Sequence, residues 1–399
     1  MVKEEEVKTV YLDNNATTMV APEVLEEMLP YFHEYYGNPS SIHSFGELVA
    51  KKIEEARERV ALLLGADPDE IVFTSCGTES DNAAILSCLE INQNKNHIIT
   101  TSVEHPAVRA LCQRLAARGY KITGLSVNSD GGLDLDEYRM ALSDDTALVS
   151  IMWANNETGV VFPVEQMADM ARGRGIIFHT DAVQAAGKIP INMKENQINM
   201  LSISGHKLHA PKGIGVLFIR KGTDFSPFII GGHQEQGRRG GTENVTGIIG
   251  LGKACELAYT DLLQESGYVR RLRDRLEDGL MKAIPRIRIN GNREKRLPNT
   301  TNISFESIEG ESILLLLDQE GICVSSGSAC SSGSSEPSHV LRAMGIPDTL
   351  AHSSIRFSLS KYNTVEEVDF VIKTLPRIVE RLREISPCWR QQYAACANS

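Results

Sequence analysis

The 399-residue sequence lacks several features that would assign it to a special class of protein. It contains no apolar run of about 18 residues, so we expect no transmembrane helix. Basic residues are not in excess: the net charge of −11 argues against nucleic acid or an anionic membrane as the main partner, because both attract clustered Lys and Arg. A hydrophobic content of 42% and a charged content of 23% are typical of a globular protein, and the length allows two domains.

Targeting and metal-binding signals are also missing. The first residues, 1–6, are acidic and have no apolar core, so they predict neither a signal peptide nor a transit peptide, and we expect a cytoplasmic protein. The eight cysteines are scattered and include no CxxC pair, which predicts free thiols in a reducing compartment and no metal site. No internal repeat is present.

Strand-like and helix-like segments alternate from about residue 50 to 260. This alternation predicts an α/β fold with a mainly parallel sheet and helices on both faces. Apolar residues at helical spacing from Val49 to Leu63, with charges on the other face, predict an amphipathic helix. The predicted strands are 71–73, 97–100, 147–153, 176–179, 199–203 and 216–219, and two of the predicted helices are 108–118 and 164–172.

Beyond residue 260 the pattern changes to that of a smaller α+β domain. It predicts, in order, a charged helix, a strand, a second helix and a short strand, at 266–284, 299–305, 311–319 and 322–324. We therefore predict a large domain of residues 16–260 and a small domain of residues 1–15 plus 261–386. The polar tail, residues 387–399, is expected to be disordered.

Lys207 ends the run SISGHK after an apolar strand and precedes a Gly-rich turn. A lysine in such a place can form an imine with an aldehyde. Asp181 follows the apolar segment 176–179, and a buried carboxylate needs a cationic partner. Pyridoxal phosphate uses such a pair, since the lysine holds its aldehyde and the acid keeps its pyridine nitrogen protonated. The alternatives are that Lys207 is an ordinary surface lysine and that Asp181 is a turn or helix-cap residue. Gln184, one helical turn after Asp181, would face the same ligand and so favours the binding role of Asp181.

A phosphate-binding turn is predicted where Gly77 and Thr78 join a strand to a helix. Free backbone N–H groups at a helix N-terminus suit a phosphate, and Ser204 and His206 supply further donors. The alternative is a plain helix cap formed by Thr78.

Two further polar residues follow other strands. His105 stands just before a proline-initiated helix, where an imidazole can stack on an aromatic ring and exchange protons; the alternative is a structural hydrogen-bond donor. Asn156 lies in a polar turn after the strand 147–153 and can bind a phenolic oxygen or a carboxylate, or form an Asn-rich turn without a ligand. Because ligands of open α/β sheets bind beyond the carboxyl ends of the strands, we expect these groups to form one site.

The second half of the chain adds three candidates. Cys330 stands among Gly, Ser and Ala residues with no apolar shell, so we expect an exposed thiol on a loop that moves between a site and a partner. Arg356 lies in a strand-like stretch and needs an anion, which is either a substrate α-carboxylate or the acid of a structural salt bridge. The basic turn 237–244 can reach a phosphate across a subunit interface.

Taken together, these segments resemble the cysteine desulfurases, enzymes of the class V aminotransferase fold, and most closely the NifS-type members. The resemblance extends from YLDNNATT, at residues 11–18, to SLS, at residues 358–360. Its motifs are GHK, HTDAVQ, EHPAV, NNETG, RRGGTEN and SGSAC. It implies a fold-type I homodimer with one pyridoxal phosphate per subunit, acting as a sulfurtransferase that converts L-cysteine to L-alanine.

The resemblance also implies roles for individual residues. Lys207 would be the Schiff-base lysine and the base, Asp181 the pyridinium partner, His105 the stacking and proton-moving residue, and Cys330 the sulfur acceptor that becomes a persulfide. The ligands would be Gly77, Thr78, Ser204, His206 and the partner subunit's Thr242 for the phosphate, Asn156 and Gln184 near the ring oxygen, and Asn156 and Arg356 for the carboxylate of L-cysteine.

Several alternatives stay open. The sulfur acceptor could be a scaffold for iron–sulfur clusters, nitrogenase-linked or housekeeping, or another target of thiolation. A selenocysteine lyase or another enzyme of the same fold is the first alternative function, although an aminotransferase would not need the SGSAC loop. A non-catalytic sulfur-assembly scaffold is the second, and the intact Lys207, Asp181, His105 and Cys330 argue against it.

Overall fold

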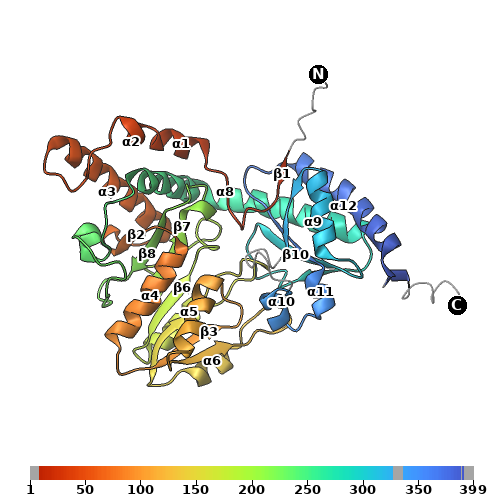
Figure 1. Cartoon of the computed structure of the whole chain (residues 1–399), viewed down its shortest axis with the longest axis horizontal. Helices are drawn as coiled ribbons and strands as arrows, with labels where there is room; N and C mark the ends of the chain where they lie inside the picture. The colour runs from red at the N-terminus through yellow and green to blue at the C-terminus, as the bar shows by residue number, and fades with distance from the viewer. Residues whose placement is uncertain (1–8, 327–335, 388, 391–399) are drawn as a thin grey trace.

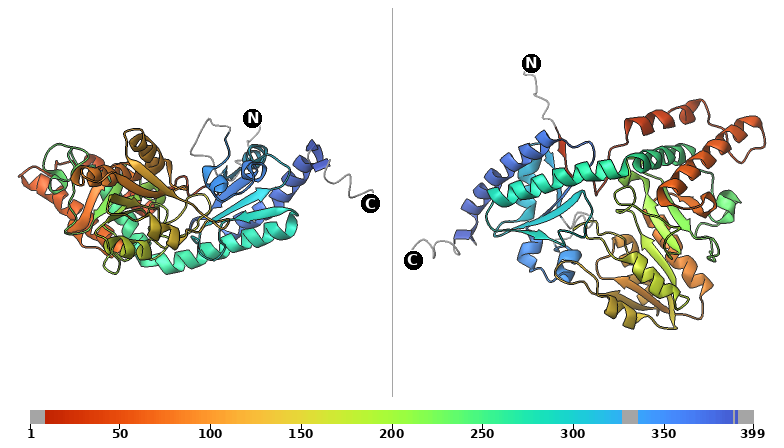
Figure 2. Two further views of the ribbon diagram at one scale, coloured as in Figure 1. Left: turned by 90° about the horizontal axis from the view of Figure 1, so that it is seen from below. Right: turned by 180° about the vertical axis from the view of Figure 1, so that it is seen from behind.

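The computed structural model describes residues 9–326, 336–387 and 389–390. A seven-stranded sheet with its helices forms one part of the molecule, and a four-stranded sheet with its helices forms the other (Figure 1). The helix α8 (Val245–Ala283) runs from one part to the other, as both views in Figure 2 show. Most of the predicted disordered tail, and Cys330 with its loop, lie outside the described residues.

The seven-stranded sheet has the order β2-β8-β7-β6-β5-β3-β4, in which β8 alone runs opposite to the other strands. This confirms the mainly parallel sheet. Most of these strands are short apolar runs without alternation, as expected where both faces of a sheet are covered. The strands are β2 (Ile71–Thr74), β3 (His97–Thr101), β4 (Lys121–Leu125), β5 (Thr146–Ser150), β6 (Ile177–Asp181), β7 (Met200–Ser204) and β8 (Gly215–Ile219).

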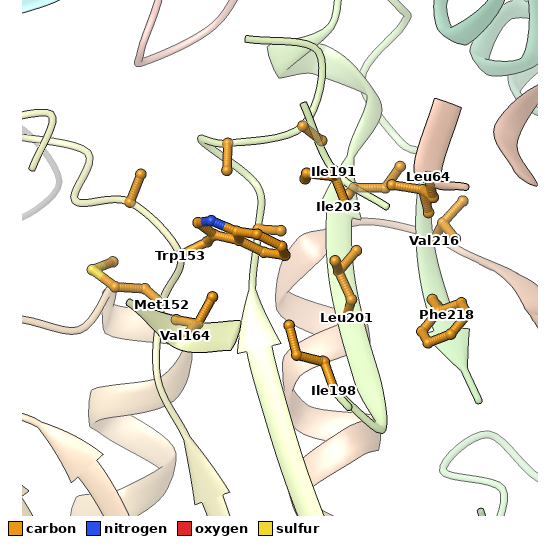
Figure 3. Packing of buried hydrophobic residues seen from close by; sticks show 14 of the residues in the cluster. Leu64, Met152, Trp153, Val164, Ile191, Ile198, Leu201, Ile203, Val216 and Phe218 are labelled. Carbon is orange, nitrogen blue, oxygen red and sulfur yellow. The ribbon is translucent and has the colours of Figure 1, made fainter. Parts of the chain in front are cut away.

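Helices cover both faces of this sheet, as predicted. On one face, α4 (Gly77–Ile91) and α5 (Pro106–Ala116) pack against one set of strand side chains, which includes Met200 of β7. The other face carries α3 (Ser44–Leu64), α7 (Val164–Arg172) and the first half of α8. Figure 3 shows Leu201 and Ile203 of β7 beside Val216 and Phe218 of β8, on the same face as Leu64 of α3.

Shorter elements complete this part. The helices α1 (Pro22–Met28) and α2 (Pro30–His33) lie along α8, and α6 (Leu135–Ala141) lies near the β4 edge of the sheet (Figure 1). Short 3₁₀ turns are η1 (Pro68–Glu70) and η2 (Gly205–Lys207), whereas the turn η3 (Gln234–Gly237) has Glu235 and Gln236 at positive φ. Within the described residues no helix combines the length and the apolar character that crossing a membrane requires.

The second part contains an antiparallel sheet in the order β12-β13-β10-β9. Strand β1 (Val10–Tyr11), from the start of the chain, pairs in parallel with β11 (Ile322–Cys323) beside this sheet. The remaining elements are β9 (Ile287–Asn290), β10 (Thr300–Phe305), β12 (Ser325–Ser326), β13 (Ser354–Ser358), α9 (Gly310–Gln319), α10 (His339–Ala343), α11 (Asp348–His352) and α12 (Val365–Ile385).

The predicted start of the helix at residue 266 is wrong, because α8 begins at Val245. Glycines at 247, 250 and 252 hide the helical signal, since glycine is a poor helix former. Two of them are required by packing: a Cβ on Gly252 would lie 2.6 Å from the Cα of Ala56 in α3, and one on Gly250 would lie 2.5 Å from the sulfur of Met28. The domain boundary predicted at residue 260 falls inside this single helix, and the division into domains stays a prediction.

We expect Gly252→Ala to destabilise the protein, because the added methyl group forces α3 and α8 apart. Overpacking of this kind costs about 1–3 kcal/mol. The control is Gly267→Ala in the same helix, where a Cβ would meet only the end of the Arg271 side chain at 3.7 Å. That variant should be about 0.5–1 kcal/mol more stable than the wild type. Chemical unfolding of both variants measures the difference, and equal free energies of unfolding would contradict the packing argument.

Candidate active site

A cavity of about 270 Å³ lies at the carboxyl edge of the seven-stranded sheet. The strands β2, β3, β5, β6 and β7 each end at this edge and contribute a loop to its wall. Nine of the predicted site residues line it together: Gly77, Thr78, His105, Asn156, Asp181, Gln184, Ser204, His206 and Lys207. The structure therefore brings into one place side chains that are up to 130 positions apart in the sequence, from 77 to 207.

Lys207 lies at the end of η2, directly after β7, and its side chain is partly buried. Its Nζ donates hydrogen bonds to the backbone carbonyls of Asn15 and Ala16, both at 2.6 Å. Asn15 and Ala16 belong to a family motif, but the sequence alone predicts no contact between them and Lys207. These two carbonyls hold the amino group at the cavity wall, where a carbonyl carbon can reach it.

Asp181 is the last residue of β6 and is almost completely buried. Its Oδ1 accepts a hydrogen bond from the N–H of Val183 at 2.9 Å. Burial raises the pKa of this carboxyl, and His105, the Val183 N–H and Lys207 oppose the rise. No ion pair to Asp181 occurs within the described part of the chain. A cationic ring nitrogen in the cavity would supply the counter-charge that the carboxylate lacks.

His105 stands at the N-terminus of α5, and its Nδ1 accepts a hydrogen bond from the N–H of Ala107 at 3.2 Å. The structural alternative for this histidine is thus partly correct, because the ring caps a helix while it lines the cavity. Burial lowers the pKa of His105. A neutral ring whose Nδ1 is an acceptor carries its proton on Nε2, so this residue has one N–H to donate or exchange.

The N-terminus of α4 points at the cavity without a side-chain cap. The helix begins at Gly77, and the preceding Cys76 makes no capping hydrogen bond, so the alternative of Thr78 as the cap is wrong. Free N–H groups at a helix start attract an anion. A Cβ on Gly77 would lie 2.8 Å from Cγ2 of Val183, which explains why glycine stands here. Burial and the charge of Lys207 lower the pKa of His206 to about 4, so its ring is neutral.

Arg356 lies in β13, is fully buried and does not line the cavity. Its Nη2 is 2.7 Å from Oδ1 of Asp13, and its Nη1 donates to the carbonyl of Asn156 at 3.2 Å. Its Nε has no partner within the described residues. The structural salt bridge that the sequence left open is therefore present, and it lies directly behind Asn156.

Thr242 is exposed in the loop before α8 and does not line the cavity of its own chain. Cys330 lies outside the described residues. Gln184 and Asn156 both contact the segment at Asn15: the amide of Gln184 donates to the Asn15 carbonyl at 3.0 Å, and the amide of Asn15 donates to the Asn156 carbonyl at 3.1 Å.

Two buried acids beside the cavity were missed by sequence reasoning. Asp81 in α4 lines the wall, and burial together with the nearby Asp181 raises its pKa well above the usual range. Glu104 is buried next to His105, and burial raises its pKa to about 8. The apolar spacing of Asp81 with Ile85 and Cys88 marks the buried face of α4 and could have revealed it. No metal-binding group of His, Cys, Asp and Glu occurs among the described residues.

The comparisons with known proteins agree with this architecture. A family model described as aminotransferase class-V matches residues 10–371, and the chain belongs to this family. Within the family the chain groups with the cysteine desulfurases. It is 60% identical over 381 residues to a cysteine desulfurase of Nostoc sp. (strain PCC 7120 / SAG 25.82 / UTEX 2576), covering 96% of this chain and 95% of that relative.

Two further comparisons point the same way. The chain is 58% identical over 381 residues to the cysteine desulfurase NifS of Azotobacter vinelandii, covering 95% of each protein. A solved structure of a NifS-like protein superposes with a TM-score of 0.88 at 42% identity, covering 94% of this chain and all of that one. The predicted family and the fold-type I architecture are therefore confirmed.

We expect Glu104→Gln to flatten part of the pH dependence of stability. The folded state holds the Glu104 proton up to about pH 8, whereas the unfolded chain releases it near 4.5. Stability from this carboxyl is therefore full below pH 4.5 and is lost as the pH rises toward 8, by up to ~1.4 kcal/mol per pH unit. Urea unfolding between pH 5 and 9 measures the slope, with the exposed Glu90→Gln as the control. Parallel profiles for wild type and Glu104→Gln would show that Glu104 does not carry the effect.

Proposed function

We propose that the protein is a pyridoxal phosphate-dependent cysteine desulfurase that removes sulfur from L-cysteine, releases L-alanine and passes the sulfur to Cys330. The observation that carries the proposal is the arrangement of the cavity. A lysine amine, a buried acid that forms no ion pair within the described residues and an uncapped helix N-terminus line one space. These are the three groups that an aldehyde, a pyridine nitrogen and a phosphate on one molecule require.

The residues present fit pyridoxal phosphate. Gly77, Thr78, Ser204 and His206 would hold its phosphate, Asp181 its ring nitrogen, and Asn156 and Gln184 its ring oxygen. Lys207 would hold its aldehyde as the Schiff base. When bound, the cofactor supplies an aldehyde that captures the substrate amine and a ring that takes up electrons from the substrate carbon.

The protein side chains then move the protons. Lys207 Nζ would accept the α-proton of L-cysteine. The carbonyls of Asn15 and Ala16 accept hydrogen bonds from this amine and so restrict where it lies. His105 carries a proton on Nε2 and lines the same wall, which suits it to proton transfer during sulfur release.

Sulfur transfer involves Cys330, whose thiolate attacks the substrate sulfur. The carbon–sulfur bond breaks, a sulfur–sulfur bond forms on Cys330, and the carbon keeps the electron pair and takes up a proton to become alanine. Arg356 and Asn156 would bind the substrate carboxylate. Asp13 Oδ1 accepts a hydrogen bond from Nη2 of the same guanidinium at 2.7 Å.

We further propose a homodimer in which Thr242 reaches the phosphate site of the partner subunit. Thr242 is exposed and lies outside its own cavity. Exposed large apolar side chains are concentrated in residues 19–48, a composition that marks protein interfaces. They are Met19, Leu25, Leu29, Phe32, Tyr35, Tyr36, Ile42, Phe45 and Leu48.

We further propose that a scaffold for iron–sulfur clusters, or another acceptor protein, takes the sulfur from Cys330 in the cytoplasm.

We expect the purified protein with a thiol reductant to release alanine and sulfide from L-cysteine in step. Cys330→Ala should reduce alanine release by roughly 100-fold or more, because the attacking thiolate is lost, while the absorbance of the bound cofactor is retained. Cys323→Ala, seven positions earlier in β11, is the matched control and should keep its activity. Normal alanine release by Cys330→Ala would rule out its role. Cofactor absorbance in the wild type without alanine release would favour selenocysteine or amino-group transfer.

Mixed dimers test the role of Thr242. Lys207→Ala chains cannot react, and Thr242→Ala chains should bind the cofactor weakly, so each homodimer is inactive at limiting cofactor. Random mixing should restore about a quarter of the wild-type sites, because each mixed dimer assembles one intact site from two chains. Recovery is measured as alanine release at limiting pyridoxal phosphate. No recovery would place Thr242 at the site of its own chain.

A further inference from the structure

Lys188 makes a hydrogen bond that connects it to the active-site cavity, although it does not line that cavity. Its Nζ donates to Oε1 of Gln184 at 2.8 Å. Lys188 is partly buried and lines a second, smaller cavity of about 60 Å³. Lys207 lines both this cavity and the active-site cavity.

The orientation of the Gln184 amide is fixed from both ends. The Nζ of Lys188 donates to the amide oxygen of Gln184 at 2.8 Å, and the other end of the amide confirms this assignment. A backbone carbonyl has no donor, so the atom that faces Asn15, at 3.0 Å from its carbonyl, must be the nitrogen. This arrangement leaves the second N–H of the amide for an acceptor in the cavity that Gln184 lines.

The same carbonyl joins Gln184 to Lys207. The oxygen of Asn15 accepts hydrogen bonds from Gln184 Nε2 and from Lys207 Nζ, at 3.0 and 2.6 Å. A continuous path therefore runs from Lys188 through Gln184 and Asn15 to Lys207. A displacement of the Gln184 amide would change both the donor that faces the cavity and the contact shared with Lys207.

The electrostatic surroundings of Lys188 argue against a role in stabilising the fold by ion pairing. Burial, followed by the charges of Lys207 and Arg356, lowers the pKa of Lys188 to about 7. No carboxylate forms an ion pair with Lys188 within the described residues, whereas Lys361, which lines the same small cavity, is paired with Glu265. A buried amine without an acid partner is costly, so its polar contact with Gln184 is the interaction that requires a lysine here.

We propose that Lys188 is a positioning residue that holds the Gln184 amide with its second N–H toward the cavity, and so strengthens the binding of an oxygen-bearing ring ligand there. The inference deepens the proposed function, because the ligand is the ring oxygen of pyridoxal phosphate. Lys188 acts only through Gln184 and does not contact the ligand itself.

The test is a titration of the apoprotein with pyridoxal 5′-phosphate, followed by fluorescence and by the absorbance of the bound cofactor. We expect Lys188→Met to weaken binding about 10-fold and to shift the pH midpoint of the absorbance change, because the donor to the ring oxygen is no longer fixed. Lys188→Arg, which keeps a donor, should recover most of the affinity. Lys188→Gln, which is polar but shorter, gives a second loss of contact if the methionine variant does not fold.

A double-mutant cycle separates action through Gln184 from a general structural effect. If Lys188 acts through Gln184, Lys188→Met should change affinity less than about 2-fold when added to Gln184→Ala. Lys361→Met is the matched control from the same small cavity and should bind the cofactor as the wild type does.

The outcomes distinguish this inference from the proposed function. If the losses of affinity caused by Lys188→Met and Gln184→Ala multiply in the double variant, the two residues act independently and the role of Lys188 is overturned. Wild-type binding and absorbance in both Lys188→Met and Lys188→Gln would overturn it as well. Failure of the wild-type apoprotein to bind the cofactor would overturn the proposed function itself.

Discussion

The position of the active-site lysine depends on the hydrogen bonds of one buried residue near the start of the chain. The amide of Asn15 donates to the carbonyl of Asn156 and to Thr300, and its oxygen accepts from Asn299. These three partners belong to a loop of the large sheet and to the start of a strand of the small one. The backbone carbonyl of Asn15 accepts hydrogen bonds from Lys207 Nζ and from Gln184 Nε2. A buried polar network that is satisfied in this way is rigid, so both sheets and the lysine are placed by the same residue.

The acids around the cavity illustrate how a binding site departs from what stability alone would favour. Asp81, Glu104 and Asp181 are buried close together, and burial raises the pKa of each one. Apolar residues at these positions would make a more stable core. Burying the Asp181 carboxylate costs free energy, and a bound cation would reduce that cost. The local destabilisation therefore contributes to affinity for a ligand with a positive ring nitrogen.

The sequence was sufficient where the signal was local. Lys207 and Asp181 each follow an apolar strand, and the rule that ligands bind at the carboxyl edge of a parallel sheet placed them together. Strand β4 was missed because its residues are half exposed at the edge of the sheet and include Gly124. The contacts of Lys207 with Asn15 and Ala16 could not be predicted, since they join positions about 190 residues apart, where no local pattern links the partners.

The long helix α8 has a mechanical consequence. At 39 residues it extends for roughly 58 Å, and its first half packs on the large sheet while its second half packs on the small one. Because α8 is continuous across the junction, a sharp kink at its midpoint would disrupt backbone hydrogen bonds. A chain cut near residue 260 would divide α8 and leave an exposed apolar face on each half of the helix. The two parts of the protein therefore depend on each other for solubility as well as for chemistry.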